Sequence, residues 1–284
     1  MQTHKQKLLI LAVALASLLT TTSCITLKEE NFFFPEKHGY LPDRTMGEIT
    51  RKNISLIASG SVTLSGMLVR HENSNDFLIY FYGNGLSVYE IQKRLYYISR
   101  QYKINVVCFD YRGYGFSEGK PSFENLLSDA LLIYDYTKKT YNPRKILIFT
   151  QSIGTVPGLN IARQKKISGI IMEAPFTNAK EGVERMTEFL IPPFRWMIYL
   201  RADKKLVKAE PQPEQMIKKI KAPLLILHGT DDGTFPQDIG KKMYEAAGSE
   251  EKTFCSLPGT GHSNVDLKAS PAKEAIDKFF KKHR

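Results

Sequence analysis

Short apolar runs alternate with segments of helical spacing from Phe77 to the end of the chain. The runs contain few polar residues, which is typical of strands buried on both faces. They cover residues 77–81, 104–109, 146–149, 169–172, 223–228 and 253–257. The segments between them, which have one apolar face, predict helices at residues 86–100, 123–139, 155–164, 238–247 and 271–282. This alternation predicts a parallel sheet with helices on both faces.

A hairpin is predicted before the parallel strands. Ile49 to Ser59 and Val62 to Val69 read as antiparallel strands with Gly60 between them, which brings the predicted sheet to eight strands. Residues 24–48 lack periodicity, so we interpret them as an irregular N-terminal tether that packs on the domain edge. The chain has 284 residues, 42% of them hydrophobic. This is enough for one domain, which we place at residues 49–284.

The first 23 residues have the three parts of a secretory signal peptide. A basic start with Lys5 and Lys7 precedes an apolar core at residues 8–19, and small polar residues follow at 20–23. The core is too short to span a bilayer comfortably. Because Cys24 follows directly, the segment resembles a bacterial lipoprotein signal, although Thr21 stands where leucine is usual. We therefore expect export and lipidation of Cys24, which would hold the domain at the cell-envelope membrane. Simple cleavage and an uncleaved anchor are the alternatives.

Charge and cysteine usage limit the possible partners. The net charge of +11 fits general solubility, or attraction to anionic lipid or an acidic substrate. No nucleic-acid-binding motif accompanies it.

Cys108 and Cys255 lie in predicted strands, so we expect two unpaired thiols. No His/Cys cluster indicates a metal, and we expect a monomer without a cofactor.

The strand at residues 146–149 runs directly into Thr150-Gln151-Ser152-Ile153-Gly154 and then into a helix. This is the nucleophile-elbow pattern G-x-S-x-G with Thr150 in the first glycine position. Such a turn lifts the Ser152 side chain above the sheet edge and points the N–H of Ile153 at the same spot. The helix N-terminus behind it favours negative charge there. Alone, the pattern favours an ordinary strand-to-helix turn, and a base, an acid and a second oxyanion donor must accompany it before it indicates a nucleophile.

A candidate base is His262, because it lies in a glycine-flanked loop after the last predicted strand. The other five histidines lie in the signal, the early region, a strand end or the tail: His4, His38, His71, His228 and His283.

A candidate orienting acid is Asp232, within His228 to Pro236 (H-G-x-x-D-x-x-F-P), with Asp231 as a turn residue. Glu173, which ends the preceding strand, is the alternative acid. We interpret Asp110 as structural, paired with Arg112 in its own loop.

The chain order Ser152, Asp232, His262 is the one that α/β-hydrolases use. The region from about Ile49 to Lys282 resembles this superfamily, especially its serine-aminopeptidase-like, monoacylglycerol-lipase-like and depalmitoylating members. Four stretches carry the resemblance: residues 82–85 (Tyr-Gly-Asn-Gly), 110–117 (Asp-Tyr-Arg-Gly-Tyr-Gly-Phe-Ser), 150–154, and 228–236 together with 261–262.

The resemblance implies Ser152 as nucleophile, His262 as base and Asp232 as acid. It also implies an oxyanion hole formed by the backbone N–H groups of Asn84 and Ile153. Two positions depart from the family pattern. Thr150 replaces a glycine and needs room for its Cβ beside the next helix. Tyr82 replaces a histidine that supports the oxyanion loop, where a tyrosine can stack instead.

The resemblance also implies a cap over the site, inserted after the sixth strand at residues 178–221. A helix is possible from Gly182 to Leu190, and residues 194–200 are strongly apolar and aromatic. Four basic residues follow: Arg201, Lys204, Lys205 and Lys208. The insertion either packs an apolar face on the core or forms an acyl-chain pocket with a basic, membrane-facing rim.

The sequence thus predicts a membrane-anchored serine hydrolase of carboxylic ester or thioester bonds. A non-catalytic surface lipoprotein that keeps the fold for binding is an alternative, and so is a serine peptidase of the same fold.

Overall fold

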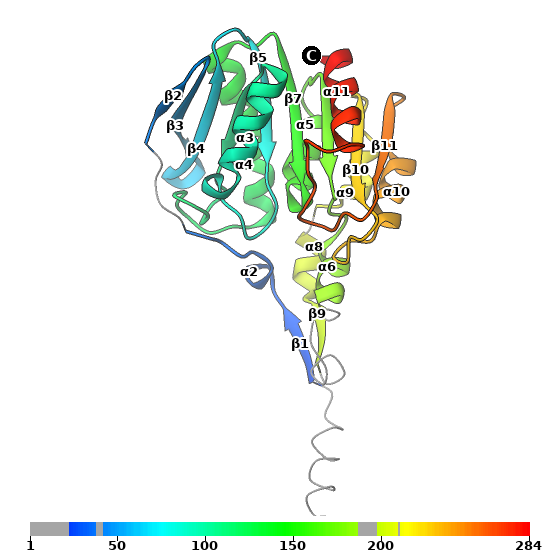
Figure 1. Ribbon diagram of the computed structural model, residues 1–284. Coiled ribbons are helices and arrows are strands. Elements are labelled where there is room, and N and C mark those ends of the chain that lie inside the picture. Colours follow the sequence, from blue (N-terminus) through cyan, green and yellow to red (C-terminus); the bar gives the residue numbers. More distant parts are fainter. Residues whose placement is uncertain (1–22, 38–41, 187–197, 210) are drawn as a thin grey trace, which may run out of the picture.

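A nine-stranded, mostly parallel sheet organises the computed structural model, which describes residues 23–37, 42–186, 198–209 and 211–284 (Figure 1). The spatial order is β11-β10-β8-β7-β5-β6-β4-β3-β2. These strands are β2 (Arg44–Met46), β3 (Ile49–Ala58), β4 (Val62–His71), β5 (Asp76–Phe81), β6 (Asn105–Phe109), β7 (Lys145–Gln151), β8 (Gly169–Glu173), β10 (Leu224–Gly229) and β11 (Lys252–Leu257). β5, β6, β7, β8, β10 and β11 pair in parallel, whereas β4 is antiparallel to both β3 and β6. The predicted α/β-hydrolase fold is confirmed.

Helices cover both faces of the sheet. α3 (Val88–Tyr102) and α11 (Ala272–His283) lie on one face, and α4 (Phe123–Tyr141), α5 (Thr155–Ala162) and α10 (Gln237–Ala246) lie on the other (Figure 1). The shorter helical elements are α2 (Glu29–Phe32), η1 (Ser59–Ser61), η2 (Ser152–Gly154), α6 (Ala179–Met186), α8 (Lys204–Ala209) and α9 (Pro213–Ile217).

The central strands form the core. All six residues of β5 and all five of β6 and β8 are buried, as expected for parallel strands covered on both faces. Because these strands run in the same direction, their carboxyl ends meet at one edge of the sheet. The loops after β5, β7, β10 and β11 carry the predicted site residues to that edge.

The ninth strand extends the eight-stranded prediction. β2 pairs antiparallel with β3, with Arg44 opposite Arg51 and Met46 opposite Ile49. The prediction of an irregular tether is wrong for these residues, because a strand of three residues is too short to show a periodic pattern. α2 also lies within that segment.

A second, two-stranded sheet joins the N-terminal segment to the cap insertion. β1 (Ser23–Leu27) pairs in parallel with β9 (Ile198–Ala202), and this sheet projects away from the body at the end where α6 and α8 lie (Figure 1). The predicted signal peptide lies outside the described residues, apart from Ser23, and so do Phe194 and Trp196 of the cap. None of the described helices has the length and apolar character needed to cross a membrane.

Candidate active site

The nucleophile elbow begins where β7 ends. Ser152 has a positive φ of 51°. Residues other than glycine rarely adopt this backbone conformation, and where they do, it is often at a functional turn. The turn also brings Gly154 against the neighbouring strand. A Cβ on Gly154 would lie 2.3 Å from the carbonyl oxygen of Phe81, so only glycine fits there. The pattern therefore produces the tight turn that raises the Ser152 side chain above the sheet.

Thr150 fits because the next helix leaves space for it. A Cβ on Gly158 of α5 would lie 2.2 Å from the Thr150 methyl carbon. The threonine methyl thus occupies the volume that a larger residue at 158 would need. Gly158, eight positions after Thr150, thus supplies the room that the family's first glycine usually provides.

Three side chains from separate loops meet at the carboxyl edge of the sheet. The Ser152 hydroxyl lies 3.0 Å from His262 Nε2, and His262 Nδ1 lies 2.8 Å from Asp232 Oδ2. The imidazole also packs on Phe235, with ring centroids 5.5 Å apart. Since the Asp232 carboxylate can only accept, Nδ1 carries the proton and Nε2 accepts from the Ser152 hydroxyl.

The Asp232 carboxylate is held from several sides. Its Oδ1 accepts hydrogen bonds from the backbone N–H groups of Thr234 (2.9 Å) and Phe235 (2.8 Å), and its side chain is fully buried. Burial alone would raise the pKa of Asp232. The hydrogen bonds from His228, His262 and the Phe235 backbone outweigh it and hold that pKa well below its ordinary value. The acid therefore stays ionised.

His228 is a supporting residue whose role the sequence did not reveal. Its Nε2 lies 2.7 Å from the carbonyl oxygen of Phe235 and 3.2 Å from Asp232 Oδ2. Both neighbours are acceptors, so this nitrogen carries the proton and donates. The ring is fully buried against Gly240, where a Cβ would lie 2.1 Å from Nδ1. The histidine of the H-G-x-x-D motif thus fixes the acid and its loop.

The alternative acid, Glu173, has a different partner. It is fully buried and forms an ion pair with Arg94 of α3. Burial raises the pKa of Glu173, and the Arg94 guanidinium opposes that rise. Its Oε1 has no hydrogen-bond partner among the described residues. Asp232, not Glu173, contacts the imidazole.

The predicted pairing of Asp110 with Arg112 is wrong. Arg112 forms a bidentate ion pair with Asp129 of α4, at 2.8 and 2.7 Å. Asp110 instead accepts from the Val88 backbone N–H at 2.7 Å and from the Tyr82 hydroxyl at 3.0 Å. Its role is structural as expected, but the groups that it holds are the start of α3 and the oxyanion loop, not Arg112.

The loop after β5 passes beside the serine. A Cβ on Gly83 would lie 3.5 Å from the Ser152 Cβ. Tyr82 supports this loop as the sequence suggested: its ring lies against Tyr111, with centroids 4.5 Å apart. Its carbonyl oxygen accepts from the Tyr111 hydroxyl at 2.7 Å. Asn84 and Ile153, the two predicted oxyanion donors, both border the cavity above Ser152.

That cavity has a volume of about 310 Å³. Most of its lining is apolar, and no acidic or cationic side chain is among the described lining residues. The lining residues are Phe32, Phe34, Gly83, Asn84, Leu86, Gln151, Ser152, Ile153, Phe176, Gly182, Thr234, Phe235, His262 and Ser263.

Comparison with known families gives a match over most of the sheet and the cap insertion. The sequence profile of the family described as serine aminopeptidase, S33 matches residues 87–209 and 192–265, which includes the elbow, the acid and the base. The chain belongs to the serine aminopeptidase S33 family.

Relatives of this S33 chain include lipases. It is 32% identical over 186 residues to lysophosphatidylserine lipase ABHD12 of Danio rerio, covering 62% of this chain and 48% of the relative. It is 37% identical over 156 residues to human protein ABHD12B, covering 50% and 41%. The chain thus spans about half the length of these relatives.

Solved structures share the fold of the S33 chain. The esterase Pf2001 of Pyrococcus furiosus superposes with a TM-score of 0.68 at 20% identity, covering 83% of this chain and 93% of the esterase. Acetyl xylan esterase 1 of Thermoanaerobacterium superposes with a TM-score of 0.65 at 15% identity, covering 85% and 86%. At this identity the likeness shows the fold alone.

Other candidate groups lie apart from the site. Within the described part of the S33 chain, no three His, Cys, Asp or Glu side chains come together in a way that could hold a metal ion. The three cysteines are unpaired: Cys24 is exposed, Cys108 is buried and Cys255 is half-buried. Of the predicted basic rim, Arg201 and Lys204 are exposed in β9 and α8, whereas the side chains of Lys205 and Lys208 lie outside the described set.

Proposed function

We propose that this protein is a membrane-anchored serine hydrolase that cleaves carboxylic ester or thioester bonds. The observation that carries the proposal is the continuous contact from the Ser152 hydroxyl through the His262 ring to the Asp232 carboxylate. A serine in this setting becomes a nucleophile, because a positioned base can take its proton as it attacks.

The reaction follows from the positions of the protons. His262 Nε2 removes the proton of Ser152 as the oxygen attacks the acyl carbonyl, and Asp232 stabilises the imidazolium that forms. The N–H groups of Asn84 and Ile153 stabilise the oxyanion, with each donor contributing a factor of about 10²–10³ in rate. The protonated imidazole then gives its proton to the leaving alcohol or thiol. Water, activated by the same nitrogen, releases the acid and restores the serine.

The lining of the cavity favours an acyl substrate. Four phenylalanines line the space next to Ser152: Phe32, Phe34, Phe176 and Phe235. An aminopeptidase needs a negative group near the serine to hold the substrate's ammonium, and none of the described lining residues supplies one. The lipase relatives also favour an ester. These observations rank ester or thioester hydrolysis above the peptidase alternative.

The test compares three types of acyl bond. Purified protein is assayed with a p-nitrophenyl ester, an acyl-coenzyme A thioester and an aminoacyl p-nitroanilide, alongside Ser152→Ala and, as a matched control, Ser128→Ala in the exposed part of α4. We expect ester or thioester hydrolysis that Ser152→Ala abolishes and Ser128→Ala leaves intact. Preferential cleavage of the anilide would favour the peptidase, and no hydrolysis of any of the three would favour the binding protein.

Membrane anchoring rests on the sequence of the first 24 residues and on the exposed position of Cys24. We expect wild-type protein expressed in bacteria to take up an alkyne fatty acid and to sediment with membranes. Cys24→Ser should lose the label, whereas Cys255→Ser should keep it. Label that persists in Cys24→Ser would contradict lipidation at this residue.

A further inference from the structure

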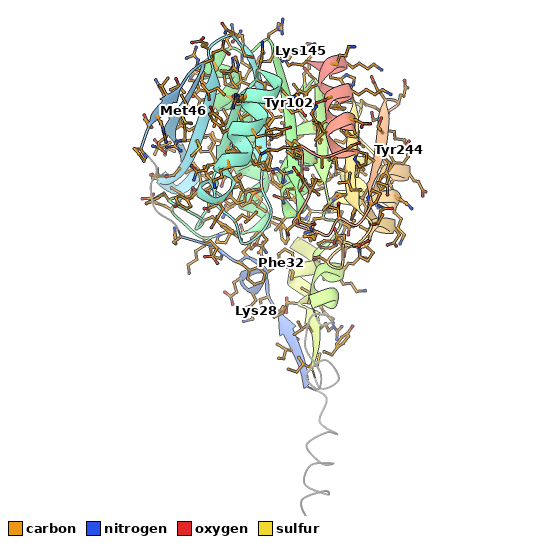
Figure 2. The ribbon with its side chains drawn as sticks, in the orientation of Figure 1. Lys28, Phe32, Met46, Tyr102, Lys145 and Tyr244 are labelled. Carbon is orange, nitrogen blue, oxygen red and sulfur yellow. The ribbon has the colours of Figure 1, made fainter. Side chains whose placement is uncertain are left out.

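The N-terminal strap, residues 29–36, lies along the candidate active site. Phe32 and Phe34 from this strap border the cavity above Ser152, although Phe34 lies 118 positions before the serine in the sequence. Phe32 is 6% exposed and Phe34 is 45% exposed. The first is therefore a buried wall of the cavity, and the second lies at its opening. Figure 2 shows Phe32 at the junction between the projecting β1–β9 sheet and the body.

The strap is fixed to the oxyanion loop by the side chain of Asn84. Its Nδ2 donates to the carbonyl oxygen of Phe32 at 2.7 Å, and its Oδ1 accepts from the backbone N–H of Phe34 at 3.0 Å. The same N–H also donates to the Tyr114 hydroxyl at 3.0 Å. At the strap's far end, the Gly115 N–H donates to the carbonyl oxygen of Glu36 at 2.7 Å. These bonds hold the strap at one position relative to Ser152.

The Phe32 ring closes the cavity against the cap. It lies 5.6 Å from the ring of Phe176, centroid to centroid. A Cβ on Gly182 of α6 would lie 3.4 Å from the Phe32 ring and 3.5 Å from the rings of Phe176 and Phe235. The absence of a side chain at 182 therefore leaves α6 in close contact with three phenyl rings. One of them comes from the strap.

We propose that the strap is part of the acyl-binding site and that Phe32 sets the length of acyl chain that the cavity accepts. This inference rests on the proposed function and deepens it. A straight fatty acyl chain is the chemistry that a largely apolar, aromatic-walled cavity without charged lining would bind. A chain that extends from a carbonyl at Ser152 meets the Phe32 ring as part of the wall, and removing the ring makes room for further methylene groups.

Phe33 provides a matched control. It lies next to Phe32 in the strap and is also buried, at 4% exposed. Both rings pack on Phe123, with centroid distances of 5.3 Å for Phe33 and 5.6 Å for Phe32. It does not border the cavity above Ser152. Loss of either ring should therefore loosen the strap to a similar extent, whereas only loss of Phe32 enlarges the cavity.

The experiment measures kcat/KM for p-nitrophenyl acetate, octanoate and dodecanoate in wild type, Phe32→Ala, Phe32→Trp and Phe33→Ala. We expect Phe32→Ala to raise the dodecanoate-to-octanoate ratio about tenfold, because one or two methylene groups in an apolar pocket change selectivity by that much. Phe32→Trp should lower the ratio, and Phe33→Ala should leave it within about twofold. Where Phe32→Ala does not fold, Phe32→Leu, which keeps more apolar volume, should shift the ratio in the same direction.

A binding measurement separates this inference from the proposed function. Calorimetric titration of octanoate and dodecanoate into Ser152→Ala, with and without Phe32→Ala, should show the same change in chain preference without any catalysis. A ratio that is unchanged in Phe32→Ala, or that changes equally in Phe33→Ala, would overturn the role of Phe32 while leaving the hydrolase intact. Fatty-acid binding that depends on Phe32, in a protein that hydrolyses none of the esters, would overturn only the proposed function.

Discussion

Replacing Asp232 with asparagine should invert the proton arrangement at His262. Oδ1 of Asp232 accepts from two backbone N–H groups, those of Thr234 and Phe235. The carbonyl oxygen of an asparagine must occupy this position, because an amide NH₂ placed there would face two donors. The NH₂ group is then forced to the position of Oδ2, which lies 2.8 Å from His262 Nδ1. A donor at that position makes Nδ1 the acceptor and moves the ring proton to Nε2.

The expected loss is large because the serine then loses its base. With a proton on Nε2, His262 cannot accept from the Ser152 hydroxyl, which lies 3.0 Å away. The same exchange in a Ser-His-Asp protease lowers kcat by about 10⁴-fold with the geometry intact. That factor corresponds to about 5.5 kcal/mol in activation free energy. The buried NH₂ also faces His228 Nε2, which donates to Asp232 Oδ2 in the wild type, so some stability should be lost as well.

The assay measures kcat and KM for p-nitrophenyl acetate in Asp232→Asn, Asp231→Asn and Glu173→Gln, each checked for folding by circular dichroism. Asp231 is the matched control, since it is exposed in the same loop and its Oδ1 accepts only from Thr230 among the described contacts. We expect a fall in kcat with little change in KM for Asp232→Asn, and near wild-type values for Asp231→Asn. A folded Asp232→Asn that keeps a tenth or more of the wild-type kcat would refute the reasoning. Loss of activity in Glu173→Gln alone would assign the acid to Glu173.

Three further predictions concern stability. Gly154→Ala should destabilise the fold by about 1–3 kcal/mol in urea unfolding, because its Cβ meets the Phe81 carbonyl oxygen; Gly233→Ala, with open space around the position, should not. Gly182→Ala should raise stability by about 0.5–1 kcal/mol, since the Cβ makes ordinary contacts within a helix; a lower melting temperature would show that the three rings cannot accommodate it. The pKa of Asp232 is lower in the folded protein than its value of about 4 in the unfolded chain. The ionised carboxylate therefore adds fully to the free energy of unfolding above about pH 4, and this contribution is lost as the pH falls from there towards the pKa of the folded state. Wild type should therefore lose more unfolding free energy than Asp232→Asn between about pH 5 and pH 3, and parallel losses would contradict this assignment.

The parallel sheet and the three contacting side chains could be predicted because local patterns determine them. Each buried strand is a continuous apolar run, and each candidate site residue follows such a run in a glycine-rich loop. Parallel strands place these loops at one edge, so the sequence alone predicts that Ser152, Asp232 and His262 meet there.

Features that depend on contacts between distant segments could not be predicted in this way. The strap has no periodicity, and its attachment depends on Asn84, about 50 residues further along the chain. The space for Thr150 comes from Gly158, which the elbow pattern does not specify. Arg112 pairs with Asp129 of α4, with which it forms two hydrogen bonds. Asp110 instead accepts from the Val88 N–H and the Tyr82 hydroxyl. His228 lay within a recognised motif, but its contact with Asp232 depends on how the loop folds back onto the strand end.

The most direct measurement is the mass of the protein after reaction with a fluorophosphonate, followed by peptide mapping. A serine activated by His262 and Asp232 should form one phosphonyl adduct, located on Ser152, and Ser152→Ala should form none. Absence of an adduct from folded wild-type protein, or an adduct on another residue with esterase activity retained in Ser152→Ala, would contradict the assignment of Ser152 as the nucleophile.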